Sequence, residues 1–254
     1  MLFAVDIGNT NIVLAIHDGK DWIDTWRIHS DCNKTSDEYY VVLESLTKHG
    51  AEKDYFIDRA IISSVVPNLT RALQKNINRL FNIEPIMIDI TLETGLVKQS
   101  IPQELGSDIL CNLSQAHAKH PGRDVMIIDF GTALTMSCVK SNGEVLGVSI
   151  APGLITAVNA LFGNTAQIPQ VELKKPKHIM GRTTDQSVRS GIMNGYVGLV
   201  ESMILKTEKE YNLNLYVIAT GGLSKTISEV IGRIDEVDPF HTLNGMKYVA
   251  QLNS

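Results

Sequence analysis

The sequence predicts an α/β protein built from two similar lobes that arose by internal duplication. A strand ending in Asp-x-Gly and then Asn or Thr occurs twice, as DIGNTN from Asp6 and as DFGTALT from Asp129. Each copy continues with the same predicted order of strands and helices, and self-similarity of this kind is typical of a duplicated domain. We place the boundary at the helix-breaking segment HPGR, which gives lobes of residues 1–120 and 121–254.

The first copy begins with three strands joined by short loops, because apolar residues alternate and Asp or Gly residues end each run. A helix follows, with Ser36 as its candidate N-cap and Gly50 at its end. The predicted elements are strands 2–9, 11–19 and 21–30, helix 36–50, strand 58–66, helix 69–81, strand 85–89 and a helix within 104–120.

The second copy repeats this order, with an Asn-Gly turn between its second and third strands. Long apolar periodicity after the third strand predicts two helices before the next strand. The predicted elements are strands 124–132, 133–141 and 144–153, helices 152–163 and 187–211, strand 215–220, and terminal helices 225–234 and 244–252.

The composition is that of an ordinary globular protein and argues against some classes of partner. Among 254 residues, 44% are hydrophobic and 20% charged, with a net charge of −5. No basic cluster stands out, so we expect no nucleic-acid partner, and KKPK at 174–177 is interpreted as a solvated loop. No apolar run of about 18 residues predicts a membrane span. The strand-like start and three scattered cysteines lead us to expect a cytoplasmic protein.

The two acid-glycine loops suit phosphate binding. An aspartate at the end of a central strand projects beyond the sheet, and the following glycine lets backbone N–H groups approach a ligand. Asn9, Thr10 and Asn11 add side chains that can bond phosphate oxygens or a metal-bound water. The alternative is a plain hairpin whose Asn and Gly only form turns, and the second copy makes that less favoured. Neither loop is a Walker A or a dinucleotide fingerprint.

GGLS, at Gly221–Ser224, is a third candidate, because glycines after a strand let an adenine or ribose lie against backbone. A turn without a ligand is the alternative interpretation. Taken together, an ordered set of motifs resembles the type III pantothenate kinases over nearly the whole chain. The set is specific, although no single motif is. In chain order the motifs are DIGNTN, SSVVP (Ser63–Pro67), P-x-E-L-G-x-D (Pro102–Asp108), DFGTALT, IAPG (Ile150–Gly153), SGI (Ser190–Ile192) and GGLS.

The resemblance implies a fold, an activity and a set of cofactors. The family belongs to the superfamily of acetate and sugar kinases, chaperone ATPases and actin. Two ribonuclease-H-like lobes, with mixed sheets flanked by helices and a cleft between the lobes, would form a homodimer. The implied activity is ATP-dependent phosphorylation of pantothenate to 4'-phosphopantothenate, the first step of coenzyme A biosynthesis. Mg²⁺ and a monovalent cation, K⁺ or NH₄⁺, would be required.

The resemblance also implies the role of each matching residue. Asp108 would be the general base, and a carboxylate near the acceptor hydroxyl can take its proton; an N-cap role for the same residue is the alternative from sequence alone. Asp129 would hold the monovalent cation. The implied ATP-binding residues are Asp6, Ile7, Gly8, Asn9, Thr10, Asn11, Ile12, Val13 and Thr132, and the implied pantothenate-binding residues are Gln99, Gly106, Ser107, Asp108, Ile109 and Thr184.

The acceptor side departs from the family pattern at two of these positions. The family has an arginine after the base, where this chain has Ile109, and commonly a tyrosine where this chain has Gln99. Isoleucine cannot replace a cation that grips a carboxylate, so Arg182 or Lys98 is a candidate substitute. Two alternatives therefore stay open: a weakly active paralogue or one with another acceptor, and a nucleotide-binding regulatory protein without catalysis.

Overall fold

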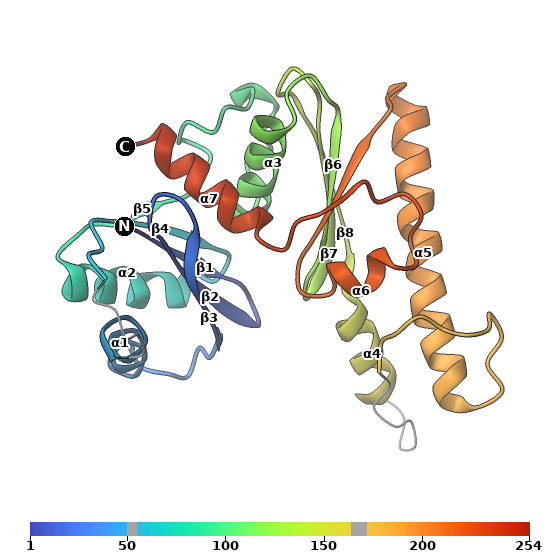
Figure 1. Cartoon of the computed structure of the whole chain (residues 1–254), viewed down its shortest axis with the longest axis horizontal. Coiled ribbons are helices and arrows are strands. Elements are labelled where there is room, and N and C mark those ends of the chain that lie inside the picture. Colours follow the sequence, from blue (N-terminus) through green and yellow to red (C-terminus); the bar gives the residue numbers. More distant parts are fainter. Residues whose placement is uncertain (50–54, 164–171) are drawn as a thin grey trace. The chain divides into compact units, whose positions relative to one another are not determined.

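The computed structural model describes residues 1–49, 55–163 and 172–254, and the chain forms two compact units (Figure 1). The first unit comprises Met1–Thr94, Pro102–Gln115 and Thr242–Ser254, and the second comprises Gly95–Ile101 and Ala116–His241. The lobe boundaries expected from the motif repeat remain a prediction. They mark where the sequence pattern repeats, whereas the units group the residues that pack together.

The first unit is built on a five-stranded mixed sheet with strand order β3-β2-β1-β4-β5. The central strand β1 pairs antiparallel with β2 and parallel with β4. Helices α1 (Ser36–Glu44) and α2 (Pro67–Phe81) lie side by side on one face of this sheet (Figure 1) and pack on the apolar residues that alternate along the strands. The strands are β1 (Leu2–Ile7), β2 (Asn11–His17), β3 (Trp22–His29), β4 (Arg59–Ser64) and β5 (Ile86–Met87).

The start of α1 corrects one detail of the sequence prediction. The N-cap is Thr35, not Ser36, because Glu38 stands three residues after Thr35 and completes a capping box. Thr35 Oγ1 accepts from the Glu38 N–H at 3.3 Å, and Glu38 Oε2 accepts from the Thr35 N–H at 2.7 Å. The helix continues as a π-helical turn, Ser45–His49, and the predicted end at Gly50 lies outside the described residues.

The second unit has the same topology, with strand order β10-β9-β6-β7-β8. Even an irregularity recurs: the register shifts between Ile16 and His17 in β2, and between Cys138 and Val139 in β7. This repetition confirms the predicted pair of mixed sheets, and the short strand β10 is one that the sequence analysis did not predict. The strands are β6 (Val125–Phe130), β7 (Ala133–Val139), β8 (Val145–Pro152), β9 (Tyr216–Thr220) and β10 (Glu236–Val237).

Three helices cover one face of the second sheet. The longest is α5 (Thr184–Tyr211), whose buried Met193, Val200 and Ile204 pack on the sheet together with α4 (Leu154–Gly163). The helix predicted at 225–234 is confined to α6 (Ser224–Ser228). Within the part of the chain that the structure describes, no helix is both long and apolar enough to cross a membrane.

The other face of the first sheet is covered by the N-terminal part of α3 (Ser107–Lys119) and by α7 (His241–Leu252) (Figure 1). Gly245 of α7 lies directly on Cys111 of α3, so that a Cβ atom at Gly245 would stand 2.6 Å from the Cys111 carbonyl carbon. The two helices can approach this closely only because glycine has no side chain. This contact fixes the C-terminal helix against the helix that begins at the predicted base.

Candidate active site

The first predicted phosphate loop is held rigidly at the carboxyl ends of β1 and β4. Asp6 pairs in register with Ser63 of the parallel strand β4. The Gly8 N–H donates to the Asn11 carbonyl at 3.0 Å, and Ser30 Oγ donates to the Gly8 carbonyl at 2.6 Å. Among the predicted ATP-binding residues of this loop, the polar side chains are half-buried or exposed (Asp6, Asn9, Thr10, Asn11), whereas Ile7 and Ile12 are fully buried.

A buried hydroxyl cluster joins the end of β4 to the start of α3. Ser107 Oγ accepts from the Ser64 N–H at 2.8 Å and lies 3.1 Å from Ser63 Oγ. It also lies 3.2 Å from the Ser64 carbonyl, to which it can donate. Ser107 is only 7% exposed, so these bonds form away from water. They fix the first residue of α3, and with it the direction of the neighbouring Asp108.

Asp108 lies one residue inside α3, so it is not the N-cap that the sequence left open. Burial raises the pKa of its carboxyl group, while the Ile109 N–H, which donates to Oδ1 at 2.8 Å, acts to lower that pKa. Burial, and then the charges of Asp6 and Asp108, raise the pKa of the fully buried Cys111 thiol. Both predicted carboxylates are therefore near one buried side chain within the first unit.

Three motifs of the second copy converge in the second unit. The Thr132 carbonyl accepts from the Gly153 N–H at 3.0 Å and from Thr156 Oγ1 at 2.6 Å, which joins DFGT to IAPG. Gly221 of GGLS has φ +88°, and a side chain there would overlap Asp129 Oδ1 and the Phe130 backbone. Glycine is required at position 221 for two reasons: the backbone has a positive φ, and Asp129 lies too close to leave room for a side chain.

The surroundings of Asp129 suit a cation that prefers oxygen ligands. Asp129 of β6 pairs in register with Thr135 of β7 and with Thr220 of β9, so the three side chains share one face of the sheet. A carboxylate and two hydroxyls are hard oxygen donors, the ligand type of Mg²⁺ and of the alkali cations. No group of three or more His, Cys, Asp or Glu side chains that could hold a metal occurs among the described residues.

The residues implied to bind pantothenate differ in exposure. Gln99 and Thr184 are exposed in the second unit, and Thr184 is the first residue of α5. In the first unit Gly106 is half-buried, whereas the Ser107 and Ile109 side chains are buried. Ile109 therefore packs in the protein interior.

Comparison with known proteins shows the family to which the chain belongs. The type III pantothenate kinase family matches residues 2–206. The chain is 40% identical over 254 residues to the type III pantothenate kinase of Acidiphilium cryptum, covering 100% of this chain and 95% of that protein. It is 36% identical over 250 residues to that of Myxococcus xanthus, covering 98% and 97%. This chain belongs to the type III pantothenate kinase family. The predicted family and enzyme class are thereby confirmed.

A solved structure supports the fold alone. The Baf family transcriptional activator, described as putative, from Campylobacter jejuni aligns with a TM-score of 0.61 at 18% identity. The alignment covers 99% of this chain and 98% of that one. The chain therefore shares its fold with that structure, and its two mixed sheets with flanking helices agree with the predicted fold class.

Sequence reasoning missed the hydroxyl cluster of Ser63, Ser64 and Ser107. A signal was present, because SSVVP follows a strand predicted to be buried and serines there need partners. Nothing in the sequence indicated that the partner would come from the residue before the predicted base. The closeness of Gly221 to Asp129 was equally hidden, since the two motifs are far apart in the chain.

The cluster makes a testable prediction for Ser107→Ala. The change leaves the Ser64 N–H and the Ser63 hydroxyl short of a buried partner, which costs about 1–3 kcal/mol of unfolding free energy. We expect kcat to fall more than the KM for ATP changes, because the direction of Asp108 is disturbed while the phosphate loop is not. Denaturant unfolding and steady-state kinetics measure the two effects.

Ser114→Ala is the matched control. Ser114 is a fully buried serine of the same helix, and among the described residues its hydroxyl donates only to the Leu110 carbonyl, at 2.7 Å within that helix. We expect this variant to keep both its stability and its kcat. If both variants lost the same unfolding free energy and the same kcat, any buried serine of α3 would be equally sensitive to substitution. The proposed role of Ser107 in positioning Asp108 would then be wrong.

Proposed function

We propose that Asp108 is the general base of the family reaction, the ATP-dependent phosphorylation of pantothenate to 4'-phosphopantothenate that begins coenzyme A biosynthesis. One observation carries this assignment: Asp108 is a half-buried carboxyl group whose pKa is raised by desolvation, and its charge, like that of Asp6, acts on the buried Cys111 thiol. A base accepts a proton best when its pKa is nearer the working pH, so the raised pKa favours this role. Phosphoryl transfer otherwise depends mainly on positioning and charge neutralisation.

The loop from Asp6 to Val13 is proposed to hold the ATP phosphates, together with Thr132. Support comes from the fixed loop backbone and from the polar side chains that it leaves half-buried or exposed. Asp6 is suited to hold Mg²⁺ through water, because Mg²⁺ retains several waters when carboxylates bind it. The ion would neutralise phosphate charge when bound.

Asp129 is proposed to hold the monovalent cation, K⁺ or NH₄⁺. The Thr135 and Thr220 side chains on the same sheet face support this, since they extend the set of oxygen donors around the carboxylate. NH₄⁺ would donate hydrogen bonds to the same oxygens.

The acceptor is proposed to contact Gln99, Gly106, Asp108 and Thr184, with Ser107 and Ile109 contributing through their backbones. The Ser107 hydroxyl is already engaged with β4, and the Ile109 side chain is buried. The Ile109 side chain therefore cannot replace the contact that the family's arginine would make with the pantothenate carboxylate. An electrostatic contact to the pantothenate carboxylate would come from other cations, with Arg182 and Lys98 as the candidates.

The functional form is proposed to be a cytoplasmic homodimer. Large apolar side chains are exposed on α4, β8 and the segment before α5, and a second copy of the chain would remove them from water. They are Ile150 (67% exposed), Ile155, Leu161, Ile179 (71%) and Met180 (81%).

The decisive test is ADP release with pantothenate as the acceptor. We expect turnover that depends on pantothenate, ATP, Mg²⁺ and K⁺ or NH₄⁺. Turnover with other small alcohols but not with pantothenate would establish an altered acceptor. ATP binding without turnover on any acceptor would refute the proposed catalysis.

A further inference from the structure

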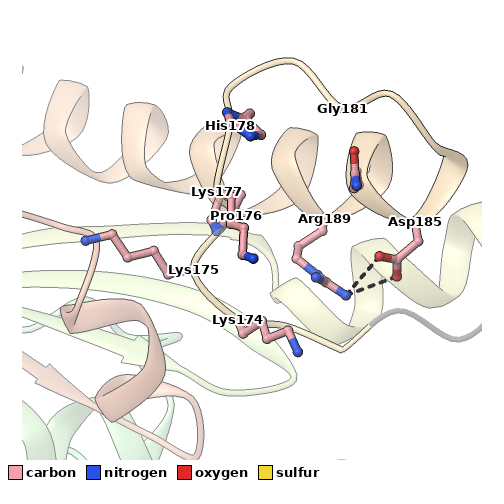
Figure 2. Close-up of a pocket in the computed structure, with 9 residues that line it drawn as sticks. Lys174, Lys175, Pro176, Lys177, His178, Gly181, Asp185 and Arg189 are labelled. Atoms are coloured by element: carbon pink, nitrogen blue, oxygen red, sulfur yellow. Dashed lines mark hydrogen bonds and ion pairs between the residues drawn. The ribbon is translucent and has the colours of Figure 1, made fainter.

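The second unit contains a basic pocket whose cationic side chains have no role in the kinase reaction proposed above. It has a volume of about 430 Å³ and lies between the segment that precedes α5 and the first turns of that helix. Figure 2 shows this segment running across the side of α5 from which Asp185 and Arg189 project. The lining residues are Lys174, Lys175, Pro176, Lys177, His178, Gly181, Asp185, Gln186 and Arg189.

The pocket wall is fixed to the helix by bonds from α5 side chains. Arg189 Nε donates to the Glu172 carbonyl at 3.0 Å, the Ser190 hydroxyl donates to the Ile179 carbonyl, and Gln186 Oε1 accepts from the Arg182 N–H at 3.0 Å. These bonds hold the wall at its beginning, middle and end. The exposed lysines therefore project from a backbone that is hydrogen-bonded to α5. The sequence alone indicated only a solvated loop at these residues.

Glycine allows the wall to close on the helix. A Cβ atom at Gly181 would lie 2.6 Å from the Ser187 Cα and would overlap the neighbouring helix backbone. The segment therefore contacts α5 backbone to backbone at this point, and this contact closes one end of the pocket.

The charge of the pocket is strongly positive in a chain whose net charge is −5. The pocket contains four cationic side chains, those of Lys174, Lys175, Lys177 and Arg189. Lys174 pairs with Glu172 at 2.7 Å, and Arg189 pairs with Asp185 at 3.0 Å. Among the described residues Lys175 and Lys177 make no ion pair, so two positive charges remain uncompensated.

We propose that this pocket binds the phosphate group of a small molecule. A phosphate monoester is close to a dianion at neutral pH, because its second pKa is about 6, and it would balance the two uncompensated charges. Lysine ammonium groups suit phosphate as compact charges, and Arg189, held in place by Asp185, offers further N–H donors. A nucleotide and the phosphorylated product of the kinase reaction share this chemistry.

The experiment is a titration of the full-length protein with inorganic phosphate at constant pH and ionic strength. The imidazole C–H resonance of His178, assigned with His178→Gln, reports on this pocket alone and needs no turnover. We expect a saturable shift in the native protein. In Lys175→Gln/Lys177→Gln the apparent Kd should rise roughly tenfold to a hundredfold, the effect typical of losing charge-assisted bonds.

Lys206→Gln/Lys209→Gln is the matched control, with the same charge change on exposed side chains of α5. Lys206 lies 17 residues after Arg189, about 25 Å along the helix axis, and we expect phosphate to bind this variant as it binds the native protein. Equal binding by the two double variants, or no His178 shift, would overturn the proposal. So would a shift caused by pantothenate, which has only a carboxylate, but not by phosphate.

Competition then identifies the source of the phosphate group. Displacement of the probe by ADP would assign the pocket to a nucleotide, and displacement by 4'-phosphopantothenate would assign it to the product. If neither displaces it, free phosphate itself is the occupant. A kinase inactive on pantothenate could still bind phosphate here, so the outcome is independent of the proposed catalytic roles.

Discussion

Replacing Asp108 with asparagine is expected to lower kcat by about 10²–10⁴-fold, the usual contribution of a general base, while ATP binding is unchanged. The amide keeps the size of the carboxyl group but cannot accept the proton of the acceptor hydroxyl. Asp108 and Asp6 both lie near Cys111. The change removes the charge of Asp108, but it leaves Asp6 and the rest of the phosphate loop in place. Single-turnover kinetics and nucleotide titration separate the two effects.

The pH dependence of the native enzyme gives a second measure of the same group. Only deprotonated Asp108 can act as a base, and burial raises its pKa. The acid limb of kcat/KM is therefore expected above the ordinary aspartate pKa of about 3.9, and the residual activity of Asp108→Asn should lack that limb.

Stability distinguishes loss of the base from loss of the fold. A carboxyl whose pKa is higher in the folded state favours folding when protonated, and this contribution is lost as pH rises through the folded pKa. At neutral pH the half-buried charge of Asp108 therefore opposes folding, and Asp108→Asn should keep or raise Tm. An inactive variant with a lowered Tm would point to structural damage, and native turnover in the variant would exclude Asp108 as the base.

The sequence predicted most of the fold because both copies use the same local signals. Alternating apolar residues predicted strands such as Leu2–Ile7 and Val125–Phe130, and the repeated Asp-x-Gly pattern predicted the duplication. The misplaced cap at Ser36 has a local cause, since two neighbouring hydroxyl residues can both cap and only the position of Glu38 selects Thr35.

Long-range contacts could not be predicted in the same way. The bonds of Ser107 to Ser63 and Ser64, and the contact of Gly221 with Asp129, join segments far apart in the chain. Neither the composition of the sequence nor the spacing of its motifs indicates which distant residues come into contact. The basic pocket could not be predicted for the same reason. Its wall is the segment that contains Lys174–Lys177, and side chains of the distant helix α5 hold that segment in place.

Gly245→Ala is expected to cause a large loss of stability. Inside an exposed helix this change would normally stabilise by about 1 kcal/mol. At Gly245 the added methyl would meet the backbone of Cys111, with the carbonyl carbon at 2.6 Å and Cα at 3.0 Å, and backbone cannot turn aside as a side chain can. Overpacking costs about 1–3 kcal/mol or more, so Tm should fall by roughly 2–12 °C in a chain of this size.

Gly198→Ala provides the opposite expectation from the same chemical change. Gly198 lies inside α5, and a Cβ atom there would have no neighbour within 4 Å. Its Tm should therefore rise by about 2–4 °C as helix propensity improves. The contrast isolates the packing of α7 on α3 from any general effect of replacing a helical glycine. If Gly245→Ala were also stabilising, the close approach of these helices beside Asp108 would be wrong, and with it the argument that α7 supports the start of the helix bearing the base.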